Sequence, residues 1–258
     1  MAPKMISIKI IAQQNLCDGA IRSFLDEHET EWHQTSGVFE QEQLCEFAGR
    51  VCYMSFGEKQ FRKSNGDYLK NIITQGHESV LEHAVWTLLI QGISRACSHQ
   101  LVRHRVGWAF SQLSQQYHEE SSKFVLPDEV RDNVKIAALW KKAINEAYDA
   151  YVSILRQLEE EGAIDASYSK REKLRLIRTA ARSVLPNAME TKIVATVNAR
   201  ALRHFLDVRG SIDGDREMRE LACALFEAVQ PTSPNLFYDF SVHKLADGHR
   251  AIKKSKQE

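Results

Sequence analysis

Cysteine is scarce in this sequence, and its few copies are scattered. The 258 residues contain five cysteines, and none of them forms a CxxC pair. An odd and dispersed set is typical of reduced, mostly buried thiols, and it does not predict a disulfide framework or a zinc knuckle. None of the five has neighbours that suggest a nucleophile, so we expect no catalytic thiol. The cysteines are Cys17, Cys45, Cys52, Cys97 and Cys223.

An excess of charge of either sign is also absent. Lysine and arginine together number 34, and so do aspartate and glutamate. A chain without a global positive field is a poor candidate for nucleic-acid binding, although a local phosphate site stays open. No apolar run approaches the roughly 20 residues that a membrane-spanning helix needs, and the first residues lack the pattern of a signal peptide. We therefore expect a cytoplasmic protein with no nucleic-acid partner and no membrane segment.

Familiar cofactor and metal motifs are missing as well. The sequence has no GxGxxG and no GxxxxGK[ST], so neither a Rossmann loop nor a P-loop can hold a phosphate, and side chains must do so. Residues 77–83 read HESVLEH, which is not the HExxH of zinc proteases, because its two histidines do not share a helix face. We therefore expect no metal site. A turn with polar groups near a ligand, or simply a capped helix start, is the better interpretation of this segment.

Residues 100–117, QLVRHRVGWAFSQLSQQY, are the richest in candidate site residues. The apolar, β-branched residues 84–97 before them predict a buried strand that runs into a helical turn. Gln100, Arg103 and His104 then follow at helical spacing and are expected to share one face near a helix C-terminus, where cations are tolerated. Two guanidinium groups beside an imidazole suit an anion site, because arginine binds phosphate through two parallel hydrogen bonds. A solvated basic turn is the alternative interpretation.

A second group of candidates lies in the downstream segment NARALRHFLDVRG. Asn198 is expected to cap the helix that follows, since asparagine accepts hydrogen bonds from the free N–H groups of a first turn. On that helix Arg209 shares a face with apolar residues, whereas Arg200 and His204 lie on the adjoining face. An unpaired buried charge is too costly, so Arg209 must pair with a carboxylate such as Asp207 or face a ligand.

Three arginines, Arg175, Arg178 and Arg182, recur on one face of a further predicted helix. For Arg175 and Arg178 a solvated stripe is the preferred interpretation. Arg182 comes one turn before Pro186, where the helix should stop, and it is the one that we expect to point at a site.

The hydrophobic pattern predicts an α+β fold with helices in the majority. Helices are expected over residues 41–53, 67–74, 129–161, 169–185, 199–208 and 215–229, and strands over 7–13 and 190–197 in addition to the buried strand above. Gly162 follows the longest helical pattern. No repeat, linker or clear boundary divides the chain, so we expect one domain over residues 1–258, a small β-sheet packed with several long helices. The basic tail, residues 249–258, is expected to be disordered.

Taken in order, these motifs resemble those of the flavin-dependent thymidylate synthases. An RHR run with later serines follows an apolar strand, and LP, ET and NARxLxxFLxxR segments come after it. The resemblance extends from about residue 76 to residue 222, and the segment GDREMRELA is also similar. This family is unrelated to the thymidylate synthase that uses a cysteine nucleophile, which agrees with the absence of a plausible nucleophilic cysteine.

The resemblance implies flavin-dependent methylation of dUMP at C5 to give dTMP, with FAD as cofactor, 5,10-methylenetetrahydrofolate as carbon donor and NADPH as reductant. It also implies a homotetramer with FAD at subunit interfaces. Arg209 is the expected catalytic residue, because a fixed guanidinium can stabilise charge that develops on the uracil ring. The residues implied to contact FAD are His77, Ser79, Arg103, His104, Arg105, Gln112, Asn198, Arg200 and His204. Those implied to contact the nucleotide are Gln100, Arg103, Gln112, Ser114, Gln116, Arg182 and Arg209.

The central stretch departs from the family pattern. One extra residue stands between the RHR run and Ser114, and Gln112 stands where many members have glutamate. Gln116 stands where the family usually has an arginine that contacts the nucleotide. Losing that contact should weaken nucleotide binding, since a charge-assisted hydrogen bond contributes about 1.5–3 kcal/mol. Lys123 and Arg203 are the candidate replacements for the missing cation.

Three functional hypotheses follow from these residues. The leading one is the methylation of dUMP. The second is the same chemistry on UMP, because the altered loop beside the nucleotide leaves the sugar open. The third is a non-catalytic relative that binds flavin or nucleotide, and it ranks last because the flavin-contacting residues and Arg209 are both present.

Overall fold

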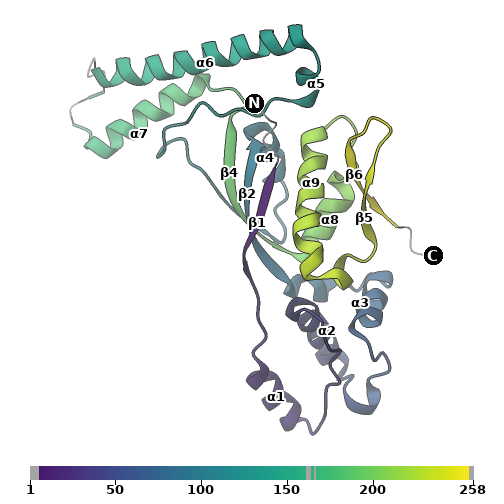
Figure 1. The fold of residues 1–258 in the computed structure, drawn as a ribbon. Coiled ribbons are helices and arrows are strands. Elements are labelled where there is room, and N and C mark those ends of the chain that lie inside the picture. Colours follow the sequence, from purple (N-terminus) through teal and green to yellow (C-terminus); the bar gives the residue numbers. More distant parts are fainter. Residues whose placement is uncertain (1–5, 161–163, 166, 256–258) are drawn as a thin grey trace. The chain divides into compact units, whose positions relative to one another are not determined.

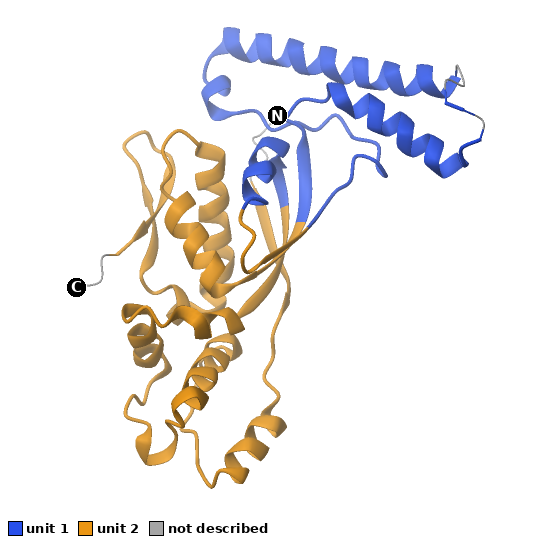
Figure 2. Cartoon of the chain, turned by 180° about the vertical axis from the view of Figure 1, so that it is seen from behind, with its two compact units in different colours: residues 1–5, 91–103, 111–193 blue, residues 6–90, 104–110, 194–258 orange. Residues whose placement is uncertain are grey.

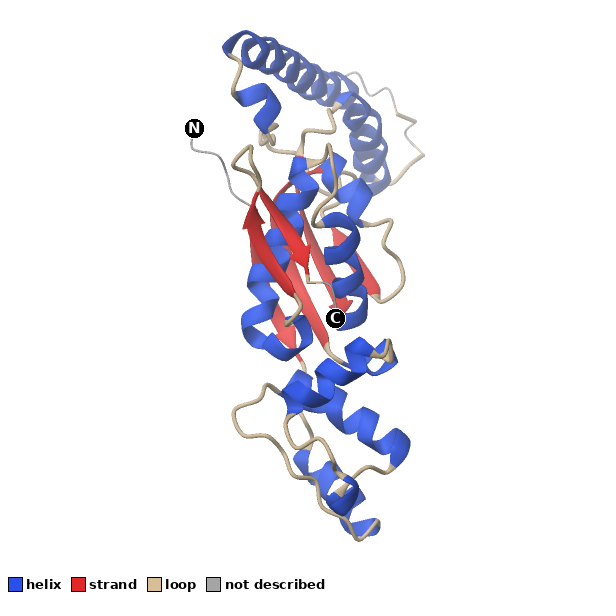
Figure 3. Cartoon of the chain, turned by 90° about the vertical axis from the view of Figure 1, so that its right-hand side faces the viewer, coloured by secondary structure: helices blue, strands red, loops and turns tan. Residues whose placement is uncertain are grey.

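The computed structural model describes residues 6–160, 164–165 and 167–255. These residues form a mixture of helices and strands, which confirms the predicted α+β class (Figures 1 and 3). The α-helices are α1 (Asp18–Glu27), α2 (Glu40–Tyr53), α3 (Asn65–Thr74), α4 (Arg95–Leu101), α5 (Asp128–Arg131), α6 (Val134–Glu160), α7 (Lys170–Ala181), α8 (Ala199–Arg209) and α9 (Arg216–Val229). Short 3₁₀ turns used below are η2 (Glu78–His83), η3 (Arg182–Val184) and η5 (Pro234–Phe237). None of the helices within the described ranges is both long enough and apolar enough to cross a membrane.

The strands form two sheets. They are β1 (Ser7–Gln13), β2 (Val85–Ser94), β3 (Trp108–Gln112), β4 (Glu190–Asn198), β5 (Phe240–Lys244) and β6 (Arg250–Lys254). The first four make one sheet in the order β1-β2-β4-β3, and the last two make an antiparallel hairpin in which Phe240 lies opposite Lys254 and Val242 opposite Ile252. The predicted strands over 7–13 and 190–197 and the buried strand after residue 84 are confirmed. Strand β3 and the hairpin were not predicted.

The described chain divides into two compact units (Figure 2). Unit 1 contains residues 91–103 and 111–193, and unit 2 contains residues 6–90, 104–110 and 194–255. Strands β2, β3 and β4 each contribute residues to both units, because the divisions fall within these strands. The predicted site residues are therefore distributed over both units.

In unit 1 the long helix α6 packs alongside α7 (Figure 1). The expected single helix over 129–161 is instead two helices, α5 and α6, with a break at Asn133. The Asn133 side chain accepts hydrogen bonds from the backbone N–H groups of Lys135 and Ile136, so it caps the start of α6. Residues 161 and 162 lie outside the described part. Helix α7 begins with a capping box, in which Ser169 and Glu172 satisfy each other's backbone N–H groups.

The core of unit 2 is built on alternate residues of β2. Trp86, Leu88 and Ile90 are fully buried, as the two-residue period of a strand requires when one face is covered. The Trp86 ring lies 5.9 Å from the ring of Phe237 in η5. Burying a large apolar side chain contributes about 1.5–3 kcal/mol. These contacts therefore hold β2, which leads into the RHR segment, against the rest of the unit.

A buried polar network joins α2 to η5 inside unit 2. The carboxylate of Glu42 accepts hydrogen bonds from the backbone N–H groups of Asn235 and Leu236 and from the amide of Asn235. Asn65 extends the network to the Glu46–Arg50 ion pair, because its side chain accepts from the amide of Asn235 and donates to Glu46. Desolvation raises the pKa of Glu42 to about 7, despite the hydrogen bonds that favour its charged form.

The C-terminal segment differs from the disorder expected over residues 249–258. Residues 250–254 form strand β6, in which Ala251 and Ile252 are buried, while residues 256–258 lie outside the described part. The backbone N–H of Ile252 donates to the carbonyl of Gly210, immediately after α8. Arg250 pairs with Glu220 and Glu227 of α9. Burial of the two consecutive apolar residues of this short strand outweighs the basic composition that suggested a frayed tail.

Candidate active site

The RHR run lies in the turn between α4 and β3. Gln100 is in the last turn of α4, and Arg103 follows the helix end, where its backbone N–H donates to the Gln100 carbonyl at 3.2 Å. The prediction that these residues lie close to a helix C-terminus is confirmed for Gln100 and Arg103, but Arg103 and His104 follow the end of α4, so the prediction that they share its face with Gln100 is wrong. Gln100 and Arg103 belong to unit 1, and His104 and Arg105 belong to unit 2.

A glycine shapes the end of this segment in unit 2. Gly107 has a φ of 73°, and the N–H of Trp108 donates to the carbonyl of Arg105, which closes a tight turn. A Cβ at Gly107 would lie 2.6 Å from the Cβ of Ala201 and 2.7 Å from the amide nitrogen of Asn198. Both the dihedral angle and the close approach therefore require glycine. The turn at Gly107 thus lies against the start of α8.

Asn198 is the N-cap of α8, as predicted. Its side-chain oxygen accepts a hydrogen bond from the backbone N–H of Ala201 at 2.8 Å. Its own backbone N–H donates to the carbonyl of Gly107. Asn198 thus connects strand β4, helix α8 and the turn that follows Arg105, so a change in the turn acts directly on the helix that carries Arg209.

His104 and Arg209 meet directly in unit 2, although 105 residues separate them. The Nε of Arg209 donates to the Nε2 of His104 at 3.1 Å. Because a nitrogen that accepts a hydrogen bond carries no proton, His104 is neutral in this geometry and its proton is on Nδ1. Burial, the Arg209 cation and nearby His204 all lower the pKa of His104, which favours the same neutral state.

Arg209 has no acidic partner within the described residues. Asp207, the carboxylate considered above, pairs with Lys254 at 2.9 Å instead. The side chain of Arg209 is half-buried, while Leu202 and Phe205 on its face of α8 are fully buried. A guanidinium whose one described partner is a neutral imidazole keeps its full charge. Of the alternatives that the sequence left open, facing an anionic ligand is the one that this geometry favours.

The other predicted flavin contacts of unit 2 surround the same helix and turn. His77 and Ser79 are exposed at the start of η2, which packs against α8. Arg200 pairs with Glu82 of η2 at 2.6 Å, and both side chains are about half exposed. His204 is exposed on α8, with its ring 6.4 Å from that of His104.

This set fits the anionic dinucleotide that the resemblance implies. Arg105 is exposed and, like Arg209, has no carboxylate partner in the part of the chain that the structure describes. The N-terminus of α8 adds a partial positive charge near Asn198. Unpaired guanidinium groups beside imidazole and hydroxyl donors match the phosphates and polar ring edges of FAD. No group of three or more metal-ligating side chains lies together in the described ranges.

In unit 1 the predicted nucleotide contacts follow β3. Gln112 donates from its amide to the hydroxyls of Ser98 and Thr191, at 3.0 and 3.2 Å. The Ser114 hydroxyl accepts from the backbone N–H of Gln116 at 3.3 Å. Arg182 is half-buried at the start of η3. Because the bond from Gln116 uses the oxygen of Ser114, its hydroxyl proton stays available, and its expected role as a donor to the nucleotide stays a prediction.

One candidate for the missing cation is excluded by its surroundings. Arg203 is 3% exposed and donates to both carboxylate oxygens of Asp239, at 2.7 and 2.8 Å, and to the carbonyl of Leu236. A guanidinium paired in this bidentate way inside unit 2 has no free edge for a phosphate. The suggestion that Arg203 replaces the arginine is therefore wrong. Lys123, the other candidate, is exposed in unit 1.

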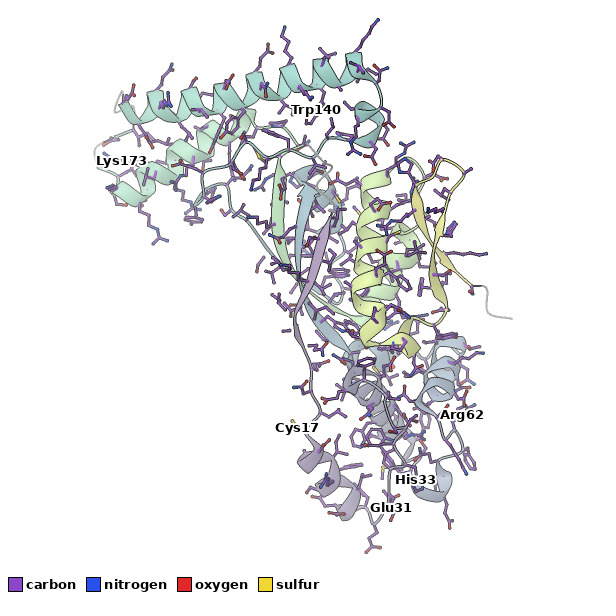
Figure 4. All side chains as sticks on the ribbon, in the orientation of Figure 1. Cys17, Glu31, His33, Arg62, Trp140 and Lys173 are labelled. Atoms are coloured by element: carbon purple, nitrogen blue, oxygen red, sulfur yellow. The ribbon has the colours of Figure 1, made fainter. Side chains whose placement is uncertain are left out.

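None of the five cysteines supplies a nucleophile to the predicted site. Cys45 and Cys223 are buried, and desolvation raises the pKa of each thiol to about 12, so neither forms a thiolate near neutral pH. Cys97 is also buried. Cys17, labelled in Figure 4, is exposed just before α1, and Cys52 is exposed on α2. The residues that carry the predicted site contain no cysteine.

One contact of the central stretch was missed. The sequence suggested a solvated stripe for Arg175 and Arg178, but in unit 1 the Nε of Arg175 donates to the side-chain oxygen of Gln116 at 3.2 Å. Arg178 pairs with Glu119 at 3.0 Å. The spacing of the arginines was visible in the sequence; their neighbour was not, because Gln116 and Arg175 are 59 residues apart.

Comparison with known proteins shows the family of the chain. Residues 36–235 match the family model described as thymidylate synthase complementing protein. The chain is 46% identical over 207 residues to a flavin-dependent thymidylate synthase of Mycobacteroides abscessus, covering 80% of this chain and 82% of the relative. It is 43% identical over 220 residues to that of Corynebacterium aurimucosum (84% and 87% covered) and 40% identical over 231 residues to that of Corynebacterium glutamicum (89% and 90% covered).

Proposed function

Because the chain belongs to the flavin-dependent thymidylate synthase family, we propose that it methylates dUMP at C5 to give dTMP. The observation that carries this proposal is the pairing of Arg209 with a neutral His104. It leaves a fully charged guanidinium, oriented from one side by an imidazole, to face a ring on which negative charge develops. The family implies FAD as cofactor, with 5,10-methylenetetrahydrofolate and NADPH as co-substrates.

Arg209 is proposed to stabilise the charge that develops on the uracil ring. Its Nε is held by His104, so the two terminal nitrogens of the guanidinium have a defined direction. A preorganised cation stabilises developing negative charge without reorganising during the reaction, and removing one such donor costs about 10²–10³ in rate. This role needs no covalent bond between enzyme and substrate, which suits a site without cysteine.

His104 is proposed to act as the acceptor that orients Arg209. A protonated imidazole would donate from both nitrogens and could not accept from Nε of Arg209. The lowered pKa of His104 therefore keeps this contact intact at neutral pH. The Nδ1–H of His104 stays available to a flavin or nucleotide oxygen.

The remaining residues are proposed to bind cofactor and substrate. When bound, FAD supplies the redox chemistry that converts the transferred one-carbon unit to a methyl group. The residues proposed to hold it are His77, Ser79, Arg103, His104, Arg105, Gln112, Asn198, Arg200 and His204. Those proposed to hold dUMP are Gln100, Arg103, Gln112, Ser114, Gln116, Arg182 and Arg209.

We further propose that the protein is a homotetramer with FAD at subunit interfaces. Exposed apolar side chains on α6 support an interface there: Val134 is 84% exposed, Leu139 69% and Ile136 47%. Residues 1–258 are proposed to act as one domain, since three strands are shared by both compact units. The cytoplasm, where the nucleotide and folate substrates are available, is the proposed location.

Product analysis tests the function. Purified protein is incubated with FAD, NADPH, methylenetetrahydrofolate and equal concentrations of dUMP and UMP. We expect dTMP as the product and little methylated UMP. Methylated UMP as the main product would reassign the substrate to a ribonucleotide. Neither product, from protein that retains flavin, would favour a binding protein without catalysis. Replacing NADPH with NADH in the same assay tests the reductant.

A further inference from the structure

Helix α7 carries a row of arginines on one face in unit 1. Arg171, Arg175 and Arg178 lie within α7 and Arg182 directly follows its end, at steps of four, three and four residues, so they project from the same side. We call this set the arginine stripe. Lys173 lies about half a turn away from the stripe; it is labelled on α7 in Figure 4.

The loop after β3 lies along the stripe. Arg175 donates from Nε to the Gln116 side chain at 3.2 Å, and its guanidinium carbon is 5.5 Å from the centre of the Tyr117 ring. The guanidinium carbon of Arg171 is 6.0 Å from the same ring. Ser114 stabilises this loop. Its hydroxyl accepts a hydrogen bond from the backbone N–H of Gln116, and its carbonyl accepts from the N–H groups of Tyr117 and His118. Two guanidinium groups thus share one aromatic side chain, which is itself 54% exposed.

Neighbouring carboxylates are already engaged. Glu119 pairs with Arg178, and Glu120 pairs with Arg95 at 2.8 Å. Glu172, the one carboxylate within α7, accepts hydrogen bonds from Ser169 in the capping box. Within the described ranges, Arg171 and Arg175 therefore contact an aromatic ring and an amide but no negative charge. Two such cations side by side repel each other unless an anion lies between them.

Gln116 orients Arg175 in a way that suits an anion. Its amide oxygen occupies the Nε–H of Arg175, so the edge formed by the two terminal nitrogens is not used by Gln116. That edge is the fork that binds two oxygens of a phosphate in parallel. The contact with Tyr117 limits the movement of the same guanidinium, because a cation is attracted to the face of the ring.

We propose that Arg171 and Arg175, oriented by Gln116 and Tyr117, bind a phosphomonoester dianion, and that this is the 5′-phosphate of the pyrimidine nucleotide. Two positive charges match the two negative charges of that group. Ser114, Gln116 and Arg182, the nucleotide contacts proposed above, belong to the same unit, which favours this source over the 2′-phosphate of NADPH. The assignment of the phosphate to the nucleotide rests on the proposed function.

The test compares the holoenzyme with Arg175→Gln and Arg171→Gln, and with Lys173→Gln as the matched control for loss of one charge on the opposite face of α7. Binding of dUMP, deoxyuridine and inorganic phosphate is measured by calorimetry. We expect each stripe variant to bind dUMP about tenfold more weakly, since contacts to charged groups are worth that much or more. Deoxyuridine, which lacks the phosphate, should bind all four proteins equally, and Lys173→Gln should match the wild type. Arg175→Lys, which keeps the charge but loses the fork, should bind with intermediate affinity.

Several outcomes would overturn the inference. Unchanged dUMP affinity in Arg175→Gln and Arg171→Gln, or equal losses for dUMP and deoxyuridine, would exclude a phosphate contact. A raised KM for NADPH with unchanged KM for NADH and unchanged dUMP binding would assign the site to the cofactor phosphate instead. Flavin absorbance and thermal melting verify that the variants are folded. Wild-type protein that binds inorganic phosphate in an Arg175-dependent way but never binds dUMP would refute the proposed function and leave the anion site standing.

Discussion

Replacing Glu42 with glutamine should flatten the dependence of folding stability on pH. In unit 2 one carboxylate oxygen of Glu42 accepts from the N–H groups of Asn235 and Leu236, and the other accepts from the Asn235 amide. The side chain is fully buried, so its charged form is poorly solvated even with these bonds. Glutamine has nearly the same shape and can accept the same backbone hydrogen bonds, but it does not ionise.

The size and sign of the effect follow from the pKa of Glu42. Burial raises this pKa from its ordinary value of 4.5 to about 7. Between these values the folded protein holds a proton that the unfolded chain releases, so stability is highest at low pH and is lost as the pH rises through this window. One pKa unit corresponds to about 1.4 kcal/mol, so the loss contributed by Glu42 amounts to about 3 kcal/mol.

Urea unfolding of the wild type and Glu42→Gln at several values from about pH 5 to about pH 8 measures this difference. The two proteins should have similar stability near pH 5, and the variant should be the more stable near pH 8. Glu58→Gln, which changes an exposed carboxylate in the same unit, is the matched control and should follow the wild type. If Glu42→Gln keeps the slope of the wild type, the buried carboxylate is not the group that titrates and the reasoning is refuted.

Three further predictions concern the site and its support. Arg209→Ala should lower turnover at least about 10²-fold while the protein keeps its flavin and its melting temperature; retained turnover in the product assay would remove Arg209 from catalysis. Gly107→Ala should lower the melting temperature more than Gly214→Ala, because both glycines have φ near 74° but only a Cβ at Gly107 meets neighbours, Ala201 and Asn198. Equal melting temperatures would show that the close approach costs nothing. Ile252→Ala should destabilise the protein by about 2–4 kcal/mol in urea unfolding, since the side chain is buried; a change within about 0.5 kcal/mol would mean that the tail does not pack as described.

The electrostatics around α8 and α7 have a common feature. At both places a guanidinium has its Nε occupied by a neutral acceptor, His104 for Arg209 and Gln116 for Arg175. A neutral acceptor orients the arginine without cancelling its charge, whereas a carboxylate such as Asp239 on Arg203 does both. This difference separates arginines available to a ligand from those that stabilise the fold.

Local patterns in the sequence were sufficient to predict most helices and strands. Strand β1, helices α2 and α9, and the asparagine cap of α8 agree with their predicted positions, because periodicity and capping chemistry act between residues close in the chain. The ordered motifs from the RHR run to Arg209 were also sufficient to indicate the family. The break at Asn133 was missed because the apolar stripe continues across it.

Tertiary structure alone decided which charges are partnered. Arg203 and Arg209 lie on the same helix and both were expected to face a ligand, yet Arg203 is buried against Asp239 and Arg209 contacts His104. Part of the basic tail also forms a strand, in which Ile252 is buried and donates its backbone N–H to the carbonyl of Gly210. Such outcomes depend on which distant elements pack together and on the solvent that packing removes, and neither is encoded in the spacing of residues along the chain.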